Sequence, residues 1–168
     1  MDSKKNYATE GGSFQLVTFR LGSENYGIPV SEVKEIIRPI KAFPVPGMAD
    51  PVVGVINLRG EIIPVLEIHS VLGVEDDPDN GKGRKKRVII LDSSEGRFGF
   101  MVDEVSDVIQ VESKDIRKSP EVSSDHSYEE SVLGIIQGEG RMIICIDPEK
   151  IVEQCLDIKA LFEECLNV

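Results

Sequence analysis

The fold of this chain is decided by the stretch from Val52 to Leu66, whose sequence is VVGVINLRGEIIPVL. Two runs of mostly β-branched residues flank the dipeptide Arg59-Gly60, and β-branched residues favour strands. Glycine supplies the positive φ that a tight hairpin turn needs. We therefore predict a β-hairpin with strands at 52–58 and 61–66.

A second copy of this hairpin follows 80 residues later. Residues 133–137 (LGIIQ) align with residues 53–57 (VGVIN), and Gly140 aligns with Gly60. The second hairpin is thus expected to have strands at 132–137 and 141–146, on either side of a glycine-rich turn.

The segments before the two hairpins also match, with a shift of 72. Tyr26–Val30 (YGIPV) aligns with Phe98–Val102 (FGFMV), and Ile36 aligns with Val108. The eight extra residues of the second copy form a longer loop around 113–131. An internal repeat of this kind indicates that the chain is two copies of one structural unit.

Each copy is predicted to consist of short strands. The first strand is expected at 14–21 and at 87–91, and the second begins at the aromatic-glycine pair. A single helical turn near Ser31-Glu32 is expected before the strand that holds Val33 and Ile36. Five short strands per copy fit a small barrel, because closure removes exposed edges. Two barrels of this size would share a hydrophobic interface.

The apolar period changes after Asp147-Pro148. Asp147 is a suitable N-cap, and proline is favoured at the first helical position. The apolar residues that follow recur at three- and four-residue spacing: Ile151, Val152, Cys155, Leu156, Ile158, Leu161, Phe162, Cys165 and Leu166. We predict an amphipathic α-helix that closes the fold, with a partner-binding helix as the alternative.

Composition excludes several classes of protein. The net charge of −11 disfavours binding to nucleic acid, since phosphate backbones are also negative. No apolar run reaches the roughly 20 residues that span a bilayer, and no signal peptide opens the chain. The three cysteines Cys145, Cys155 and Cys165 form no CxxC motif and have apolar neighbours. They are expected to be reduced, packed thiols of a cytoplasmic protein.

No catalytic or cofactor motif is present. His69 and His126 lie at non-equivalent places in the repeat, neither belongs to an HExxH motif, and no metal-ligand spacing occurs. Glu67 and Asp147 are repeat-equivalent, so an acid-dyad hydrolase is the one enzyme class that stays open. The glycines at 81–83 do not form a phosphate-binding loop. We expect no enzyme activity, no metal and no cofactor, and therefore a binding module.

Four segments resemble the CheW family of chemotaxis coupling proteins. Residues 53–65 resemble its G-[VI]-x-N-L-R-G-x-[IV]-[IV]-P-[VI] signature, and residues 102–108 resemble its V-D-x-V-S-D-V segment. Tyr26-Gly27-Ile28 with residues 33–36 resembles its first-barrel motif, and residues 141–144 resemble its closing strand.

The resemblance covers about residues 13–152 and implies a CheW-like domain of two intertwined five-stranded SH3-like barrels. A disordered tail over 1–12, a linker near 74–87 and a C-terminal helix extension over 153–168 complete the expected organisation. The implied role is a non-enzymatic cytoplasmic adaptor that joins chemoreceptor tips to the regulatory domain of the chemotaxis histidine kinase at membrane-associated arrays.

Residue by residue, the resemblance also implies a receptor-binding surface. Its positions fall on Val33, Glu35, Asn57 and Arg59, with apolar support from Val105 and Val108. A helical receptor tip would lie between the barrels on these side chains. We expect Ile36 to face the core, so that Ile36→Glu is destabilising, whereas Val33→Glu mainly harms binding. The hydrophobic end of a barrel is expected to contact the kinase.

Two other binding roles stay open. The chain could be a coupling protein for a pathway that controls surface motility or gene expression, or a detached regulatory domain of the kinase itself. The NLRG sequence at the first hairpin tip favours the adaptor.

Overall fold

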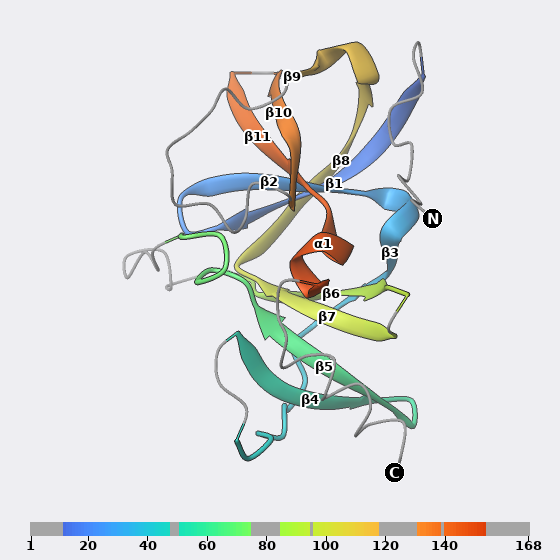
Figure 1. The fold of residues 1–168 in the computed structure, drawn as a ribbon, viewed down its shortest axis with the longest axis vertical. Helices are drawn as coiled ribbons and strands as arrows, with labels where there is room; N and C mark the ends of the chain where they lie inside the picture. The colour runs from blue at the N-terminus through green and yellow to red at the C-terminus, as the bar shows by residue number, and fades with distance from the viewer. Residues whose placement is uncertain are drawn as a thin grey trace.

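The computed structural model describes residues 12–47, 51–74, 85–94, 96–117, 131–138 and 140–153, which form two β-sheets and one short helix (Figure 1). The first sheet has the strand order β8 (Glu104–Glu112), β1 (Ser13–Leu21), β2 (Glu24–Pro29), β11 (Arg141–Ile146), β10 (Val132–Gly138), β9 (Ile116–Arg117). The second has the order β3 (Val33–Ile37), β6 (Arg87–Asp92), β7 (Arg97–Val102), β5 (Glu61–Glu67), β4 (Val52–Leu58).

Both predicted hairpins are confirmed. β4 pairs with β5 around Arg59-Gly60, and β10 pairs with β11 in the same register. The expected helical turn is the 3-10 helix η1 (Val30–Glu32), which separates β2 from β3. The strand ends differ from the expected ones by about one residue.

Each sheet is built from both sequence copies. β1 and β2 of the first copy pair with β8 and β11 of the second copy. In return, β6 and β7 of the second copy pair with β3 and β5 of the first. The two barrels are therefore intertwined, and neither copy forms a barrel with its own strands alone.

Each sheet closes into a barrel because the chain that continues from one edge strand pairs with the strand near the opposite edge. In the first barrel, the 3-10 helix η3 (Ser113–Asp115) turns the chain from β8 into β9, which pairs with β10. In the second barrel, Phe43 follows β3 and pairs with Val55 of β4. The barrels thus close in equivalent ways, as the duplication requires.

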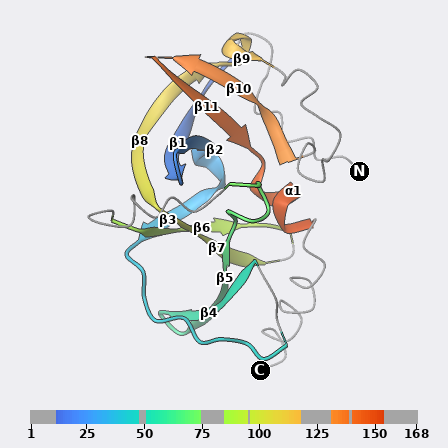
Figure 2. The ribbon, with the colours of Figure 1, turned by 90° about the vertical axis from the view of Figure 1, so that its left-hand side faces the viewer.

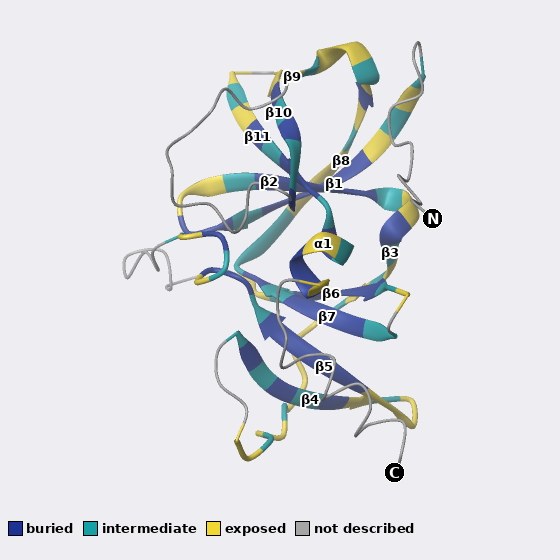
Figure 3. Cartoon of the chain, viewed as in Figure 1, coloured by how far each residue is buried: buried dark blue, intermediate teal, exposed yellow. Residues whose placement is uncertain are grey.

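The core has three parts, one inside each barrel and one between them. Residues alternate between these parts along β6: Val88 and Ile90 fill the second barrel, whereas Ile89 and Leu91 face the shared interface. Both faces of this strand are therefore buried, as the dark blue central strands of Figure 3 show. The shared part also contains Phe19 of the first copy. It joins the two barrels into one body.

Glycine is required where strands approach closely. A Cβ at Gly99 would lie 2.7 Å from Val88 Cγ1, and one at its equivalent, Gly27, would lie 3.2 Å from Leu16 Cδ1. A Cβ at Gly54 would lie 2.5 Å from the Phe43 carbonyl oxygen. The repeated glycines therefore allow the strands to close each barrel.

The helix α1 (Pro148–Glu153) begins at the predicted cap, because the Glu149 N–H donates to Asp147 Oδ1 at 3.1 Å. Its Ile151 and Val152 are buried in the shared core, and Figures 1 and 2 show it between the two barrels. The described part of the helix thus closes the fold. The rest of the predicted helix, the tail over residues 1–11 and most of the linker lie outside the described residues. No helix that the structure describes is long and apolar enough to cross a membrane.

Candidate partner-binding surface

Arg59 occupies a strained position at the tip of the first hairpin. Its φ is +51°, and no other described residue except glycine has a positive φ. The Gly60 N–H donates to Asn57 Oδ1 at 2.9 Å, so Asn57 holds the turn in this shape. A left-handed conformation is costly for a residue with a Cβ. An arginine where glycine would be easier indicates a role for its side chain.

The side chain of Arg59 reaches back to strand β3. Its Nη1 and Nη2 donate to the two carboxylate oxygens of Glu35, at 2.6 and 2.9 Å. The hydrogen bond from Arg59 lowers the pKa of Glu35 below its usual range, and the same bond raises the pKa of Arg59. The pair is exposed, so its value for stability is small. The two hydrogen bonds instead fix the positions of the Arg59 guanidinium and the Glu35 carboxylate on the surface.

Further ion pairs bind the same hairpin to the neighbouring strands. Arg97 donates to Glu61 at 3.0 Å and to Asp92 at 2.9 Å, and Lys34 lies 3.4 Å from Asp92. Burial raises the pKa of Asp92, but the hydrogen bond and charge of Arg97, with those of Lys34, leave it below its ordinary value. This chain of charges keeps the hairpin tip in place beside β3.

The expected apolar residues lie at the seam of the two barrels. Val33 on β3 and Val105 on β8 are partly buried and pack against the shared core. Val108 is 54% exposed. Figure 2 shows β3 and β8 along the same side of the molecule. Val33 and Val105 are repeat-equivalent, so this surface has an approximate two-fold arrangement.

The expectation that Ile36 faces the core is wrong. Ile36 is 39% exposed, whereas Val33 contacts the shared core. Burial along β3 alternates at every second residue, with Val33, Glu35 and Ile37 partly buried and Lys34 and Ile36 exposed. The alternation itself was expected, but its phase was wrong, because the shared core packs against Val33 and not against Ile36.

Ile36 is the member of this surface that sequence reasoning missed. It is equivalent to Val108 in the repeat, and both side chains are exposed. That equivalence was visible in the sequence. The complete apolar set is Val33, Ile36, Val105 and Val108.

The second copy carries an ion pair of its own, which was also missed. Arg141 Nη2 donates to both carboxylate oxygens of Asp107, at 3.0 and 2.9 Å. Asp107 is equivalent to Glu35, but Arg141 is equivalent to Glu61 rather than to Arg59. The hydroxyl of Thr18 also donates to Asp107, and this hydrogen bond is the largest single cause of the lowered pKa of Asp107, followed by the hydrogen bond and charge of Arg141. Glu139, the sequence equivalent of Arg59, lies outside the described residues.

The histidine and cysteine candidates that the structure describes are buried residues of the fold. His69 is 5% exposed and lies 3.0 Å from Asp103 Oδ2, so it is a packed residue of the fold. His126 lies outside the described residues. Cys145 is fully buried, and burial raises the pKa of its thiol to about 12, so the thiolate is not formed near neutral pH. No group of three or more potential metal ligands occurs within the described ranges.

Comparison with known proteins identifies relatives over most of the chain. The family described as the CheW-like domain matches residues 15–155. The chemotaxis protein CheW of Rhizobium meliloti is 32% identical over 154 residues, which cover 90% of this chain and 94% of that protein. The chemotaxis protein CheW of Bacillus subtilis is 31% identical over 141 residues, 83% of this chain and 87% of that protein.

A solved structure has the same architecture. The crystal structure of scaffolding protein TtCheW from Thermoanaerobacter tengcongensis matches with a TM-score of 0.74 and 29% identity. The match covers 83% of this chain and 88% of that one. The match extends over both barrels and not over a single sheet.

Proposed function

This chain belongs to the CheW-like domain family, and from that premise we propose that it couples chemoreceptor tips to the chemotaxis histidine kinase without catalysing a reaction. Its role as a chemotaxis adaptor or scaffold agrees with its relatives and with the scaffolding protein of the same fold. The proposal adds the two partners, the cytoplasmic location and the recruitment to membrane-associated receptor arrays.

The observation that carries the proposal is the surface along β3 and β8. Val33 and Ile36 lie on β3 with Glu35, which pairs with Arg59, and Val105 and Val108 hold the repeat-equivalent places on β8. An amphipathic helix docks by placing its apolar face on such side chains. The charged pair at the border would set the position of the helix, since charges at the rim of an interface favour specificity more than affinity.

The kinase would bind outside the surface along β3 and β8, so that the receptor and the kinase can bind at the same time. We propose the regulatory domain of the kinase as this second partner, in contact with the hydrophobic end of a barrel. An adaptor needs two surfaces that can be occupied at once, and two fused barrels provide more than one exposed end.

The test is a reconstituted array of receptor fragments, kinase and this protein, with kinase activity as the readout. Val108→Ser and Ile36→Ser are expected to lower receptor-dependent activation by about tenfold, since central apolar contacts dominate binding. Binding to the isolated kinase regulatory domain, measured by calorimetry, should stay unchanged. Lys114→Ser is the matched control, because Lys114 is exposed and belongs to η3, beyond the end of β8. Normal activation by both variants would refute the receptor-binding surface.

A further inference from the structure

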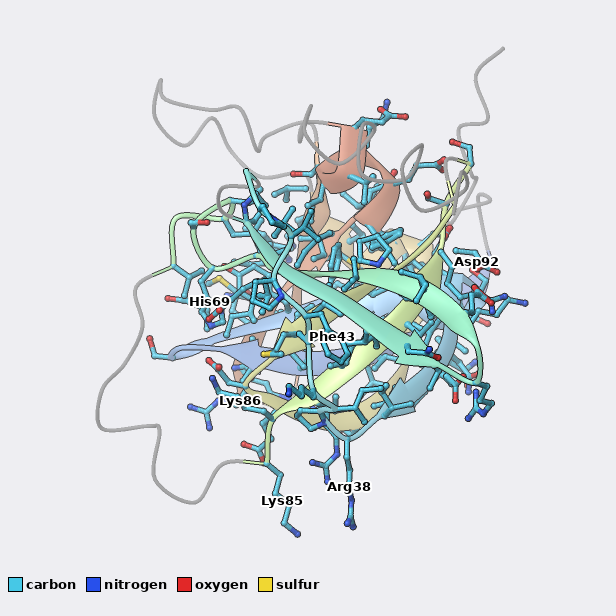
Figure 4. The ribbon with its side chains drawn as sticks, turned by 90° about the horizontal axis from the view of Figure 1, so that it is seen from below. Arg38, Phe43, His69, Lys85, Lys86 and Asp92 are labelled. Carbon is cyan, nitrogen blue, oxygen red and sulfur yellow. The ribbon has the colours of Figure 1, made fainter. Side chains whose placement is uncertain are left out.

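A second surface borders the first where β3 ends and β6 begins. Ile37 pairs with Val88, so Arg38 leaves the sheet where Lys85 and Lys86 enter it. Figure 4 shows Arg38 and Lys85 projecting from the same edge, with Lys86 and Phe43 nearby. We call this the basic face. Its members are exposed: Arg38, Ile40, Lys41, Phe43, Lys85 and Lys86.

The cations of the basic face form no ion pair with any residue that the structure describes: Arg38, Lys41, Lys85 and Lys86. Six other described cations do form ion pairs: Lys34, Arg59, Arg97, Lys114, Arg141 and Lys150. The charge of Lys86 contributes to the lowered pKa of Asp103, which is partly buried. In a chain with a net charge of −11, the basic face is a local excess of positive charge.

Phe43 gives the basic face an apolar anchor in a fixed place. Its N–H donates to the Val55 carbonyl oxygen at 2.8 Å, and its carbonyl accepts from the Val55 N–H at 2.9 Å. The ring is nevertheless 52% exposed. Lys41 Nζ lies 5.4 Å from the ring centroid, within the range of a cation–π contact. An exposed aromatic held rigidly among cations is typical of an interface anchor.

We propose that the basic face binds a carboxylate-rich segment of a partner protein that also carries an apolar side chain for Phe43. The attraction between the basic face and an acidic segment acts locally, since salt screens the interaction of exposed charges beyond about 8 Å at physiological ionic strength. A short acidic segment would meet only the basic face. An extended polyanion, such as an anionic membrane or a nucleic acid, would also meet the acidic remainder of the surface and be repelled.

The test uses a labelled synthetic peptide, in which glutamates surround one leucine and one phenylalanine, and the full-length protein. Nitrogen-15 NMR should show shifts of the Arg38, Phe43 and Lys86 amides and little change at Asp107. Lys85→Glu/Lys86→Glu should weaken binding by about tenfold or more and reduce its salt dependence. Lys114→Glu/Lys150→Glu makes the same charge change at paired sites and should alter binding by less than about twofold.

The apolar anchor is tested separately. Phe43→Ser should weaken peptide binding by about tenfold, whereas Met142→Ser, a control at a similarly exposed residue (51%) of the other barrel, should not. A peptide with glutamine in place of glutamate should not bind. Both variants should keep the far-ultraviolet circular dichroism of the unchanged protein, which separates loss of binding from loss of fold.

Three results would overturn the proposal. Equal peptide binding by Lys85→Glu/Lys86→Glu would remove the basic face as the site. Binding to vesicles with 30% phosphatidylserine but not to the peptide would make a membrane the occupant. Peptide binding that rises about tenfold when the acidic residues at 75–79 are neutralised would make that segment of the same chain the occupant.

Discussion

Glu35 and Asp107 hold equivalent places on β3 and β8, and each accepts a two-bond contact from an arginine of a hairpin. The arginines themselves are not equivalent, since Arg59 stands at a turn and Arg141 at the start of a strand. The carboxylate is thus common to both copies, while the cation comes from different places. The two halves of the surface have similar charge but different shapes, which is suited to one asymmetric partner.

We predict that Arg59→Gly separates stability from function. Glycine adopts a positive φ without strain, so the thermal midpoint should change by less than about 3 °C. Receptor-dependent kinase activation should nevertheless fall by about tenfold, because the cation is lost. Lys150→Ala, which removes a cation of α1 that is paired only with Glu153 among the described residues, serves as the control. Full activation by Arg59→Gly would leave Arg59 with no role beyond the turn.

The alternating burial of β3 predicts different losses of stability for two glutamate substitutions on the same strand. Val33→Glu would place a charge against the shared core and should lower the free energy of unfolding by about 2–4 kcal/mol. Ile36→Glu should lower it by less than about 1 kcal/mol, because Ile36 is exposed. Urea unfolding followed by circular dichroism measures both. Equal losses would contradict the assigned faces.

Gly99 is predicted to be the tighter of the two aromatic-adjacent glycines. Gly99→Ala brings a Cβ to 2.7 Å from Val88 Cγ1 and should cost about 1–3 kcal/mol of unfolding free energy. Gly138→Ala, with no atom within 4 Å, is the matched control and should be nearly neutral. Adding Val88→Ala to Gly99→Ala should give less destabilisation than the sum of both single changes. An additive result would mean that another contact is responsible.

Asp103, which joins the two sequence copies, should make the free energy of unfolding depend on pH. Burial raises its pKa, but hydrogen bonds from the Gly22 N–H at 2.6 Å and from His69 at 3.0 Å leave it below the ordinary 3.8. A lowered carboxyl pKa stabilises the fold above the unfolded-state value, and that contribution is lost as pH falls through the folded value. Asp103→Asn should therefore cost about 1–3 kcal/mol at pH 7, with the difference shrinking below about pH 4. A difference that stays constant down to pH 2.5 would exclude this origin.

Local features of the fold could be predicted from the sequence because they depend on near neighbours. The hairpin turn at Arg59-Gly60 and the helix start at Asp147 are examples, since each depends on residues within a few positions. The duplication also allowed the shared core to be predicted, because two small units with equivalent apolar positions bury them against each other.

Other features depend on which strands pair, and no local pattern records that. Pairing of β1 with β8 buries the same kind of side chain as pairing within one copy would, so strand exchange left no separate signal. The contact between Arg59 and Glu35 joins residues 24 positions apart. The face of Ile36 was predicted incorrectly because an alternating strand has two possible phases, and the phase is set by the distant strands that pack on Val33.

The strand exchange has a consequence for the origin of the molecule. One sequence copy contains parts of two barrels and the whole of neither, so a protein with a single copy could complete its barrels only by exchanging strands with another molecule. The present chain has the strand arrangement of such an exchanged homodimer with its two subunits joined in one chain. Joined copies are free to differ, and here the arginine is at a turn in one half and at the start of a strand in the other. An ancestral pair of identical surfaces could in this way become a single surface with a defined direction.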